Sequence, residues 1–236
     1  MKFVHPPIFE YTHPLPENEL RAEAVNLPVG DMFLSRFEGE NPQMSWIAYY
    51  RDRVNDYGYF LHFMDKYAPF LDKIEELWPD RMYGVAEFGC GIANTCKYLA
   101  QLRTSQFYCY DIDPDMLALA EENMRSTNYD SLFHIHDITQ TLPNRRYDIV
   151  HSHGVLEHFS DMDIENIFYH QTQVTDHIVH YVPTDGYETP SFGDERLMSP
   201  EKWAEILSAF DVEMETFNDG LDLMIWWSNP NPQDPQ

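Results

Sequence analysis

The chain has 236 residues, 43% of them hydrophobic and 15% aromatic, which is enough for one globular domain with a full core. Its 40 acidic residues outweigh 15 basic ones and give a formal net charge of −25. A surface of that sign repels phosphate backbones and anionic lipid surfaces. We therefore expect neither a nucleic-acid partner nor a membrane partner.

The N-terminal sequence and the cysteines indicate the cellular compartment. No apolar run of the signal-peptide kind follows the first residues, and no stretch reaches the roughly 18 uncharged apolar residues of a membrane-spanning helix. The three cysteines, Cys90, Cys96 and Cys109, form neither a paired disulfide framework nor a Cys-x-x-Cys ligand set. These features predict a cytoplasmic protein with reduced, buried thiols.

The N-terminal third of the chain differs from the rest in composition. Residues 1–43 contain six prolines, so they cannot form one long helix, and we expect them to wrap the domain or to cover its site as a lid. Residues 44–228 form the expected main domain, and the proline-rich residues 229–236 a flexible tail. Apolar residues at three- and four-residue spacing predict an amphipathic helix over 45–67, ended by Pro69, and a short helix over 71–78.

Downstream of the second helix, short apolar runs alternate with helical segments. This alternation predicts an α/β fold with a mostly parallel, doubly wound, Rossmann-like sheet and helices on both faces. Asp113 with Pro114, Ser160 and Ser199 are expected helix starts. The expected strands cover 85–88, 106–110, 132–136, 148–152, 177–182, 212–217 and 221–227, the last two as an antiparallel pair, and the helices cover 94–102, 114–124, a segment from 161, and 200–210.

A glycine-rich turn follows the first expected strand. Gly89 and Gly91 stand where a strand must turn sharply into a helix while its backbone approaches a ligand. About twenty residues later, Asp111 ends the second strand, where a carboxylate can accept both hydroxyls of a ribose. Glu87 would repel a pyrophosphate and attract an ammonium group, and Asn94 replaces the small residue of a dinucleotide site. The expected ligand therefore contains a nucleoside but no dinucleotide.

The segment from Glu87 to Ala93 resembles the first motif of the class I S-adenosylmethionine-dependent methyltransferases, acid-x-Gly-x-Gly-x-small. The resemblance covers residues 85–227. It implies S-adenosylmethionine as cofactor, a small-molecule acceptor, and a sheet of about seven strands whose last strand is antiparallel. It also implies a cofactor site made of the methionine-side residues Glu87, Gly89, Gly91 and Ala93, the ribose acid Asp111, the adenine-side residues Ile112, Met116, Asp137 and Ile138, and Ser152 near the transferred methyl group.

The loop after the fourth strand contains our expected catalytic residues. Methyl transfer from a sulfonium requires alignment and exclusion of water, and a site can add a base for the acceptor's proton. Glu157 and His158, with His153 shortly before them, are suited to that role; alternatively, His158 caps a helix or binds a carbonyl. Some similar quinone-pathway O-methyltransferases hold a divalent metal with two glutamates and the histidine. Gly154 occupies the first glutamate position here, so we predict no metal.

Two other groups of residues are expected to contribute to the site. A sulfonium is a soft cation that aromatic rings can surround, although most rings will serve the core. The candidates for such a cage or for an acceptor pocket are Tyr49, Tyr50, Tyr57, Tyr181, Tyr187, Trp226 and Trp227. Arg51 or Arg53 could bind the methionine carboxylate; pairing with neighbouring acids is the alternative.

The sequence thus predicts a methyltransferase that acts on an oxygen, nitrogen or carbon atom of a small molecule. One alternative is an enzyme that consumes S-adenosylmethionine itself, by cyclising its aminobutyrate arm and releasing methylthioadenosine. Another is a binding module without catalysis. The intact Glu87, glycine pair and Asp111 disfavour the binding module.

Overall fold

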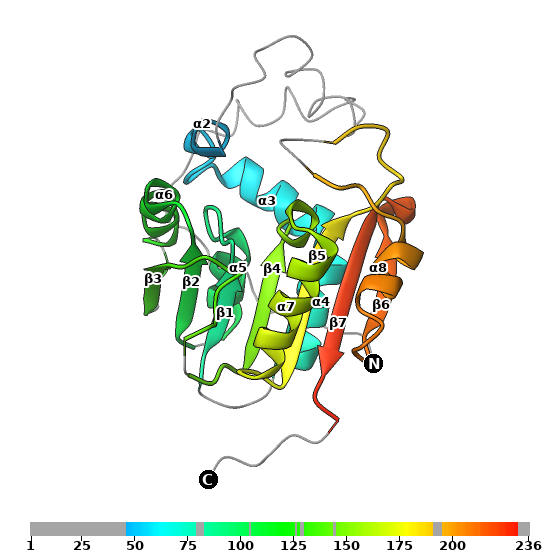
Figure 1. Ribbon diagram of the computed structural model, residues 1–236. Coiled ribbons are helices and arrows are strands. Elements are labelled where there is room, and N and C mark those ends of the chain that lie inside the picture. Colours follow the sequence, from blue (N-terminus) through cyan, green and yellow to red (C-terminus); the bar gives the residue numbers. More distant parts are fainter. Residues whose placement is uncertain are drawn as a thin grey trace, which may run out of the picture. The chain divides into compact units, whose positions relative to one another are not determined.

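A computed structural model of the protein describes residues 46–78, 83–103, 105–125, 127, 130–143, 145–190 and 195–230. The expected N-terminal lid and residues 231–236 of the expected tail lie outside these ranges. The described strands form one seven-stranded sheet in the order β3-β2-β1-β4-β5-β7-β6 (Figure 1). This is the predicted fold class.

Strand directions follow the prediction as well. Strands β1 to β5 run parallel to their neighbours, and β7 pairs antiparallel with both β5 and β6. Each predicted strand is present within one or two residues of its expected ends. The strands are β1 (Val85–Phe88), β2 (Phe107–Asp111), β3 (Ser131–Ile135), β4 (Ile149–His153), β5 (His177–Pro183), β6 (Glu213–Phe217) and β7 (Asp222–Ser228).

Helices cover both faces of the sheet, as predicted. One apolar cluster joins α4, α5 and α6 to the sheet, and a second joins α7 and α8 to its other face (Figure 1). None of the helices in the described ranges has the length and apolar composition needed to cross a membrane. The helices are α2 (Trp46–Arg51), α3 (Tyr57–Lys66), α4 (Ala68–Leu77), α5 (Asn94–Leu102), α6 (Pro114–Met124), α7 (Asp161–Thr172) and α8 (Pro200–Ile206), with short 3-10 turns η1 (Leu156–His158) and η2 (Asn218–Gly220).

The three expected helix starts are confirmed. Asp113 accepts from the backbone N–H of Asp115 at 2.8 Å, with Pro114 in the first turn of α6. Ser160 and Ser199 each accept from the N–H three residues later, which satisfies one of the unpaired donors of the first turn of α7 and α8.

The prediction of one helix over residues 45–67 is wrong. The chain forms α2 and α3, separated by a turn in which Asn55 has a positive φ of 60°. Asp56 then caps α3 by accepting from the N–H of Tyr59 at 3.0 Å. Pro69 does not end this segment but lies in the first turn of α4, where a missing N–H costs nothing. The helix predicted over 200–210 is shorter and ends at Ile206.

Asn123 on α6 joins three parts of the fold. Its side chain is 1% exposed, and its Nδ2 donates to the carbonyl of Ile92 at 2.7 Å and to Oδ1 of Asn94 at 2.9 Å. Its Oδ1 accepts from the N–H of Asn55 at 3.2 Å and from Nζ of Lys97 at 2.8 Å. One amide therefore ties the α2–α3 turn to the glycine turn and to α5.

We expect Asn123→Ala to destabilise the protein by about 2 to 4 kcal/mol, because the Ile92 carbonyl and Oδ1 of Asn94 lose their partner in a buried place. Urea unfolding would measure the loss. Glu121→Ala, at an exposed position of the same helix, is the control. Equal stability of the two variants would contradict the role given to Asn123.

Candidate functional site

The predicted cofactor residues gather at one edge of the sheet. β1 lies between β2 and β4, and all three are parallel, so their carboxyl ends meet. Ligands of open α/β sheets bind beyond such ends. Helices α2 and α3 lie beyond this same end of the sheet (Figure 1).

The glycine turn between β1 and α5 adopts left-handed backbone conformations. Gly89 has a φ of 64°, Gly91 of 53° and Ala93 of 56°. A Cβ atom on Gly89 would stand 2.6 Å from a methyl group of Val155, in the loop after β4. The turn therefore requires glycine at position 89 for space and for conformation.

Glu87, near the end of β1, is buried against the start of α5. Its side chain is 2% exposed, and its Oε2 accepts from the backbone N–H of Cys96 at 3.3 Å. Ala93, the residue before α5, offers no side-chain cap, so the carboxylate satisfies a donor of the first helical turn. Burial, followed by the nearby Cys109 thiol, raises the pKa of Glu87 to about 8. Oε2 of Glu87 thus faces α5, and the predicted contact of Glu87 with the ligand's amino group, directly or through water, stays a prediction.

The thiols of this region are buried, as expected. Cys90, Cys96 and Cys109 are free and enclosed in the core. Possible ligand atoms of Glu87, Cys96 and Cys109 lie within 4.8 Å of one another, a grouping that the sequence spacing did not indicate.

Asp111 lies where the ribose acid was predicted. Its Oδ2 accepts from the N–H of Gly91 at 3.1 Å and its Oδ1 from the N–H of Asp113 at 3.0 Å, so it holds the glycine turn against the start of α6. Burial raises its pKa. Each carboxylate oxygen keeps acceptor capacity for a ligand hydroxyl. Beside it, Ile112 is 66% exposed and Met116 is buried.

The predicted adenine-edge residues form a local turn after β3. Oδ1 of Asp137 accepts from the N–H of Thr139 at 2.9 Å and from its hydroxyl at 2.7 Å. These hydrogen bonds hold the pKa of Asp137 below its usual value. Ile138 is buried in the core. The turn is therefore preformed, and its contact with adenine stays a prediction.

The side chain of Ser152 is occupied inside the core, and the predicted contact of this residue with the cofactor stays a prediction. The residue is fully buried, and its hydroxyl lies 2.7 Å from Nδ1 of His180, whose Nε2 in turn lies 2.7 Å from Oε1 of Gln171. Successive residues of a strand point to opposite faces, so Ser152 faces the α7 side while its neighbours face the α4 side.

His153, at the end of β4, is enclosed by aromatic rings. Its ring centroid lies 4.2 Å from that of Tyr67 and 4.4 Å from that of Tyr181. Burial, followed by the positive charge of Lys66, lowers its pKa to about 3, so the imidazole is neutral near neutral pH. Its Nε2 has no partner among the described residues.

The loop after β4 brings two glutamates and a histidine together. Glu157 is 1% exposed, and Nε2 of His158 lies 4.0 Å from its Oε1. Glu195 joins them from a distant part of the chain, with ligand atoms of all three within 4.8 Å. Gly154 makes room, because a Cβ there would stand 3.3 Å from Oε1 of Glu157. The sequence analysis named Glu157 and His158 but missed the role of Glu195.

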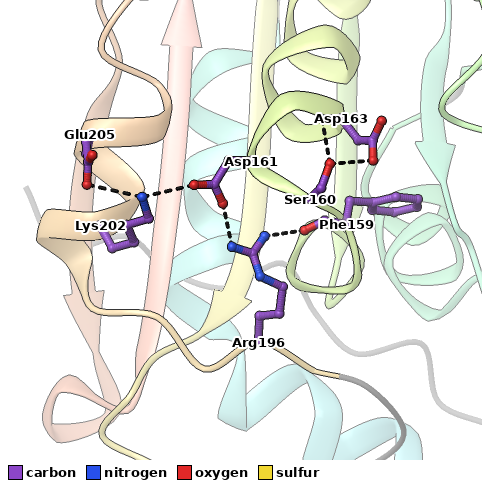
Figure 2. A network of polar contacts seen from close by, with 7 residues as sticks. All are labelled: Phe159, Ser160, Asp161, Asp163, Arg196, Lys202 and Glu205. Carbon is purple, nitrogen blue, oxygen red and sulfur yellow. Dashed lines mark hydrogen bonds and ion pairs between the residues drawn. The ribbon is translucent and has the colours of Figure 1, made fainter.

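A polar network holds Arg196, the residue that follows Glu195 (Figure 2). Arg196 donates to the carbonyl of Phe159 and pairs with Asp161. Lys202 pairs with the same Asp161 at 2.9 Å. The backbone N–H of Arg196 also donates to the carbonyl of Glu157 at 3.0 Å. The segment carrying Glu195 is therefore fastened to the loop carrying Glu157.

Three rings of α2, which we call the α2 aromatic cluster (Trp46, Tyr49 and Tyr50), connect the two halves of the site. The Tyr50 ring stands 3.6 Å from the place of a Cβ on Gly91. Trp46 stacks on Tyr50 and meets the ring of His158 edge-on, with centroids 6.0 Å apart in both pairs. The sequence analysis missed Trp46, although it lies three and four residues before the two tyrosines that it named.

Comparisons with known proteins agree with this geometry. Residues 85–176 match the family model described as "Methyltransferase domain". That segment, which runs from β1 to the loop before β5, therefore resembles a methyltransferase domain. A comparison with curated proteins gives no significant match.

Solved structures share this fold. The DhpI-SAH complex is 20% identical with a TM-score of 0.57, over 79% of this chain and 96% of that one. Magnesium protoporphyrin IX methyltransferase (ChlM) from Synechocystis PCC 6803 with bound SAH is 14% identical with a TM-score of 0.56, over 85% and 94%. An S-adenosylmethionine-dependent methyltransferase from Clostridium acetobutylicum ATCC 824 is 14% identical with a TM-score of 0.56, over 75% and 100%. The match to a methyltransferase model and the fold shared with these structures agree with the predicted resemblance.

We expect Glu87→Gln to flatten the pH dependence of the domain's stability. A carboxyl group with a raised folded-state pKa stabilises the fold below its unfolded value, and the contribution is lost as pH rises through the folded value. For Glu87 that window runs from 4.5 to about 8. Between the ends of this window, wild type should lose on the order of a few kcal/mol relative to the variant in urea unfolding. An identical pH dependence of the two proteins would contradict the placement of Glu87.

Gly89→Val and Asp111→Ala should each weaken binding of S-adenosylhomocysteine about 100-fold or more. The valine would displace the turn against Val155, and the alanine would release Gly91 and remove the ribose acceptor. Isothermal titration calorimetry measures the affinity. Gly220→Ala is the control, because Gly220 also has a positive φ but nothing within 4 Å of an added Cβ. If both test variants bound S-adenosylhomocysteine with wild-type affinity, the assignment of the glycine turn and Asp111 as the cofactor site would be contradicted.

Proposed function

We propose that the protein transfers the methyl group of S-adenosylmethionine to an oxygen, nitrogen or carbon atom of a small molecule, and that the acceptor binds next to Glu157 and His158. One observation carries the proposal. The glycine turn with Asp111 and the loop with Glu157 follow neighbouring parallel strands, and the α2 aromatic cluster spans both. Cofactor and acceptor groups therefore share one edge of the sheet.

The residues at the glycine turn suit a nucleoside cofactor. The left-handed Gly89 and Gly91 let backbone approach the ligand without a Cβ, and Asp111 retains acceptor capacity for ribose hydroxyls. The exposed Ile112 offers an apolar side for the base. When bound, S-adenosylmethionine supplies a methyl group that moves to the acceptor atom as the carbon–sulfur bond breaks.

The residues after β4 suit the acceptor. Alignment of the reacting atoms and exclusion of water can lower the activation barrier of methyl transfer by about 7 to 11 kcal/mol. The rings of the α2 aromatic cluster serve to exclude water from the acceptor. His158 and Glu157 stand where they can take or hold the acceptor's proton. His153 is the further base that the sequence predicted, but the burial that keeps it neutral also lowers its pKa to about 3 and makes it a weaker base than an ordinary histidine.

The first test is to incubate the purified protein with S-adenosylmethionine alone and to analyse the small molecules by mass spectrometry. We expect the cofactor to stay intact, and S-adenosylhomocysteine to accumulate only when a pool of small amines, phenols and carboxylic acids is added. His158→Ala should reduce that rate by about 100-fold or more if its imidazole takes the acceptor's proton.

The other outcomes separate the alternatives. Methylthioadenosine with a four-carbon amino-acid product, above the background without protein, would show that the cofactor is itself the substrate. No binding of S-adenosylmethionine or S-adenosylhomocysteine would point to a module without catalysis. Either result would overturn the proposed function.

A further inference from the structure

Two neighbouring strands and the helix α5 bring a carboxyl group and two thiols together in the core. Glu87 on β1 and Cys109 on β2 are register partners, so their side chains leave the same face of the sheet. Cys96 lies in the first turn of α5, which packs on that face, and its backbone N–H donates to Oε2 of Glu87 at 3.3 Å. Possible ligand atoms of the three residues lie within 4.8 Å of one another.

This group, which we call the thiol–carboxylate site (Glu87, Cys96 and Cys109), is closed to solvent. Both thiols are fully buried, and Glu87 is 2% exposed. A buried thiol by itself packs as a small apolar side chain and needs no ligand. A buried carboxyl group is different, because its removal from water costs free energy unless a proton, hydrogen bonds or a cation compensates for it. Thiols beside such a group form a set of metal ligands.

We propose that the thiol–carboxylate site binds a zinc ion, with Cys96 and Cys109 as thiolate ligands and Glu87 as a carboxylate ligand. The inference goes beyond the proposed function and does not depend on it. Zinc takes sulfur and carboxylate oxygen ligands in proteins. Binding releases the two thiol protons to solvent, and the carboxyl proton where Glu87 holds one. The ion then neutralises two of the three negative charges of its ligands.

The spacing of the ligand atoms suits zinc. The ion lies about 2.3 Å from a thiolate sulfur and about 2.0 to 2.2 Å from a carboxylate oxygen. Because the three ligand atoms are at most 4.8 Å apart, a central ion lies no farther than about 2.8 Å from each of them. Side-chain movements of about half an ångström therefore bring the three ligands to zinc. The fourth position of a tetrahedral ion is left open by these three residues.

Zinc at this place joins the elements that carry the predicted cofactor residues. Glu87 stands two residues before Gly89, and Cys109 stands two residues before Asp111. Cys96 belongs to the helix that follows the glycine turn. Closed zinc sites contribute directly to the free energy of folding. The ion is therefore structural, and it fastens β1, β2 and α5 to one another beside the glycine turn.

Two neighbouring features of the chain allow matched controls. Cys90 is another buried thiol of the same core, but its Sγ lies 3.7 Å from the carbonyl of Gly91, and it does not belong to the group of three. A second group of possible ligands consists of Glu157, His158 and Glu195 and contains no thiol. A metal ion bound to that group has no sulfur ligand, so a spectrum distinguishes the two places.

The test uses the full chain, purified without chelators and without a metal-affinity column. Inductively coupled plasma mass spectrometry should find about one zinc ion per chain. Exchange of zinc for Co²⁺, by dialysis or by refolding of the metal-free chain, should give the intense sulfur-to-cobalt charge-transfer absorption of thiolate ligands. Removal of zinc should lower the midpoint of thermal unfolding by about 10 °C, because the ion binds only the folded chain tightly.

The variants locate the ion. Cys96→Ser and Cys109→Ser should each reduce the bound zinc by about tenfold or more, and Glu87→Gln should weaken zinc affinity by about tenfold while it keeps the shape of the side chain. Cys90→Ser and His158→Ala are the controls and should keep both the zinc and the cobalt absorption. If a cysteine variant does not fold, the cobalt spectrum of the wild type still decides whether thiolates bind the ion.

Several results would overturn the inference. These are a wild type without zinc both as purified and after refolding with Zn²⁺, cobalt binding without the charge-transfer absorption, and full zinc content in both Cys96→Ser and Cys109→Ser. Loss of zinc in His158→Ala but not in the cysteine variants would assign the metal to the loop after β4. A disulfide between Cys96 and Cys109, found by mass spectrometry of the purified protein, would assign the thiols to redox chemistry instead. None of these results bears on the proposed methyl transfer.

Discussion

The site depends on the left-handed turn that links β1 to α5. Such a turn points backbone groups away from regular partners, and side chains from three other places satisfy them. Asp111 accepts from the N–H of Gly91, and Asn123 donates to the carbonyl of Ile92. Glu87 accepts from the first turn of α5, which lacks a local cap. The turn is thus held by β2, α6 and β1 together, and a ligand meets a surface that is already formed.

The acceptor side of the site is built differently. There the loop after β4 and the segment around Glu195 are joined by ion pairs and backbone hydrogen bonds. Exposed ion pairs contribute little to stability individually. Their effect here is positional, because they bring the carboxylate of Glu195 beside that of Glu157. Residues of this kind are free to change the acceptor while the cofactor side stays the same.

Burial rather than net charge controls the ionisation of the groups in the site. The chain carries 40 acids, yet three of them, Glu87, Asp111 and Glu157, have a raised pKa because they are removed from water. The same desolvation keeps His153 neutral. Removal from water thus favours the neutral form of each of these groups, and electrostatic interactions with a bound molecule are strong in such surroundings.

The sequence by itself determined the order of strands and most helices, the glycine turn, the place of Asp111 at the end of β2 and the caps at Asp113, Ser160 and Ser199. These features depend on residues within about four positions of one another, where backbone geometry and spacing decide the outcome. The spacing of apolar residues wrongly predicted one helix across Asn55, because a residue with a positive φ interrupts a helix without disturbing the apolar pattern.

Only the tertiary structure decided where the other side chains go. The hydroxyl of Ser152 contacts His180, and the carboxyl group of Glu87 accepts from the first turn of α5. The side chain of Glu195 lies beside that of Glu157, and the ring of Trp46 contacts that of His158. Each contact joins elements whose relative positions follow from packing of the whole domain, so no local pattern encodes it.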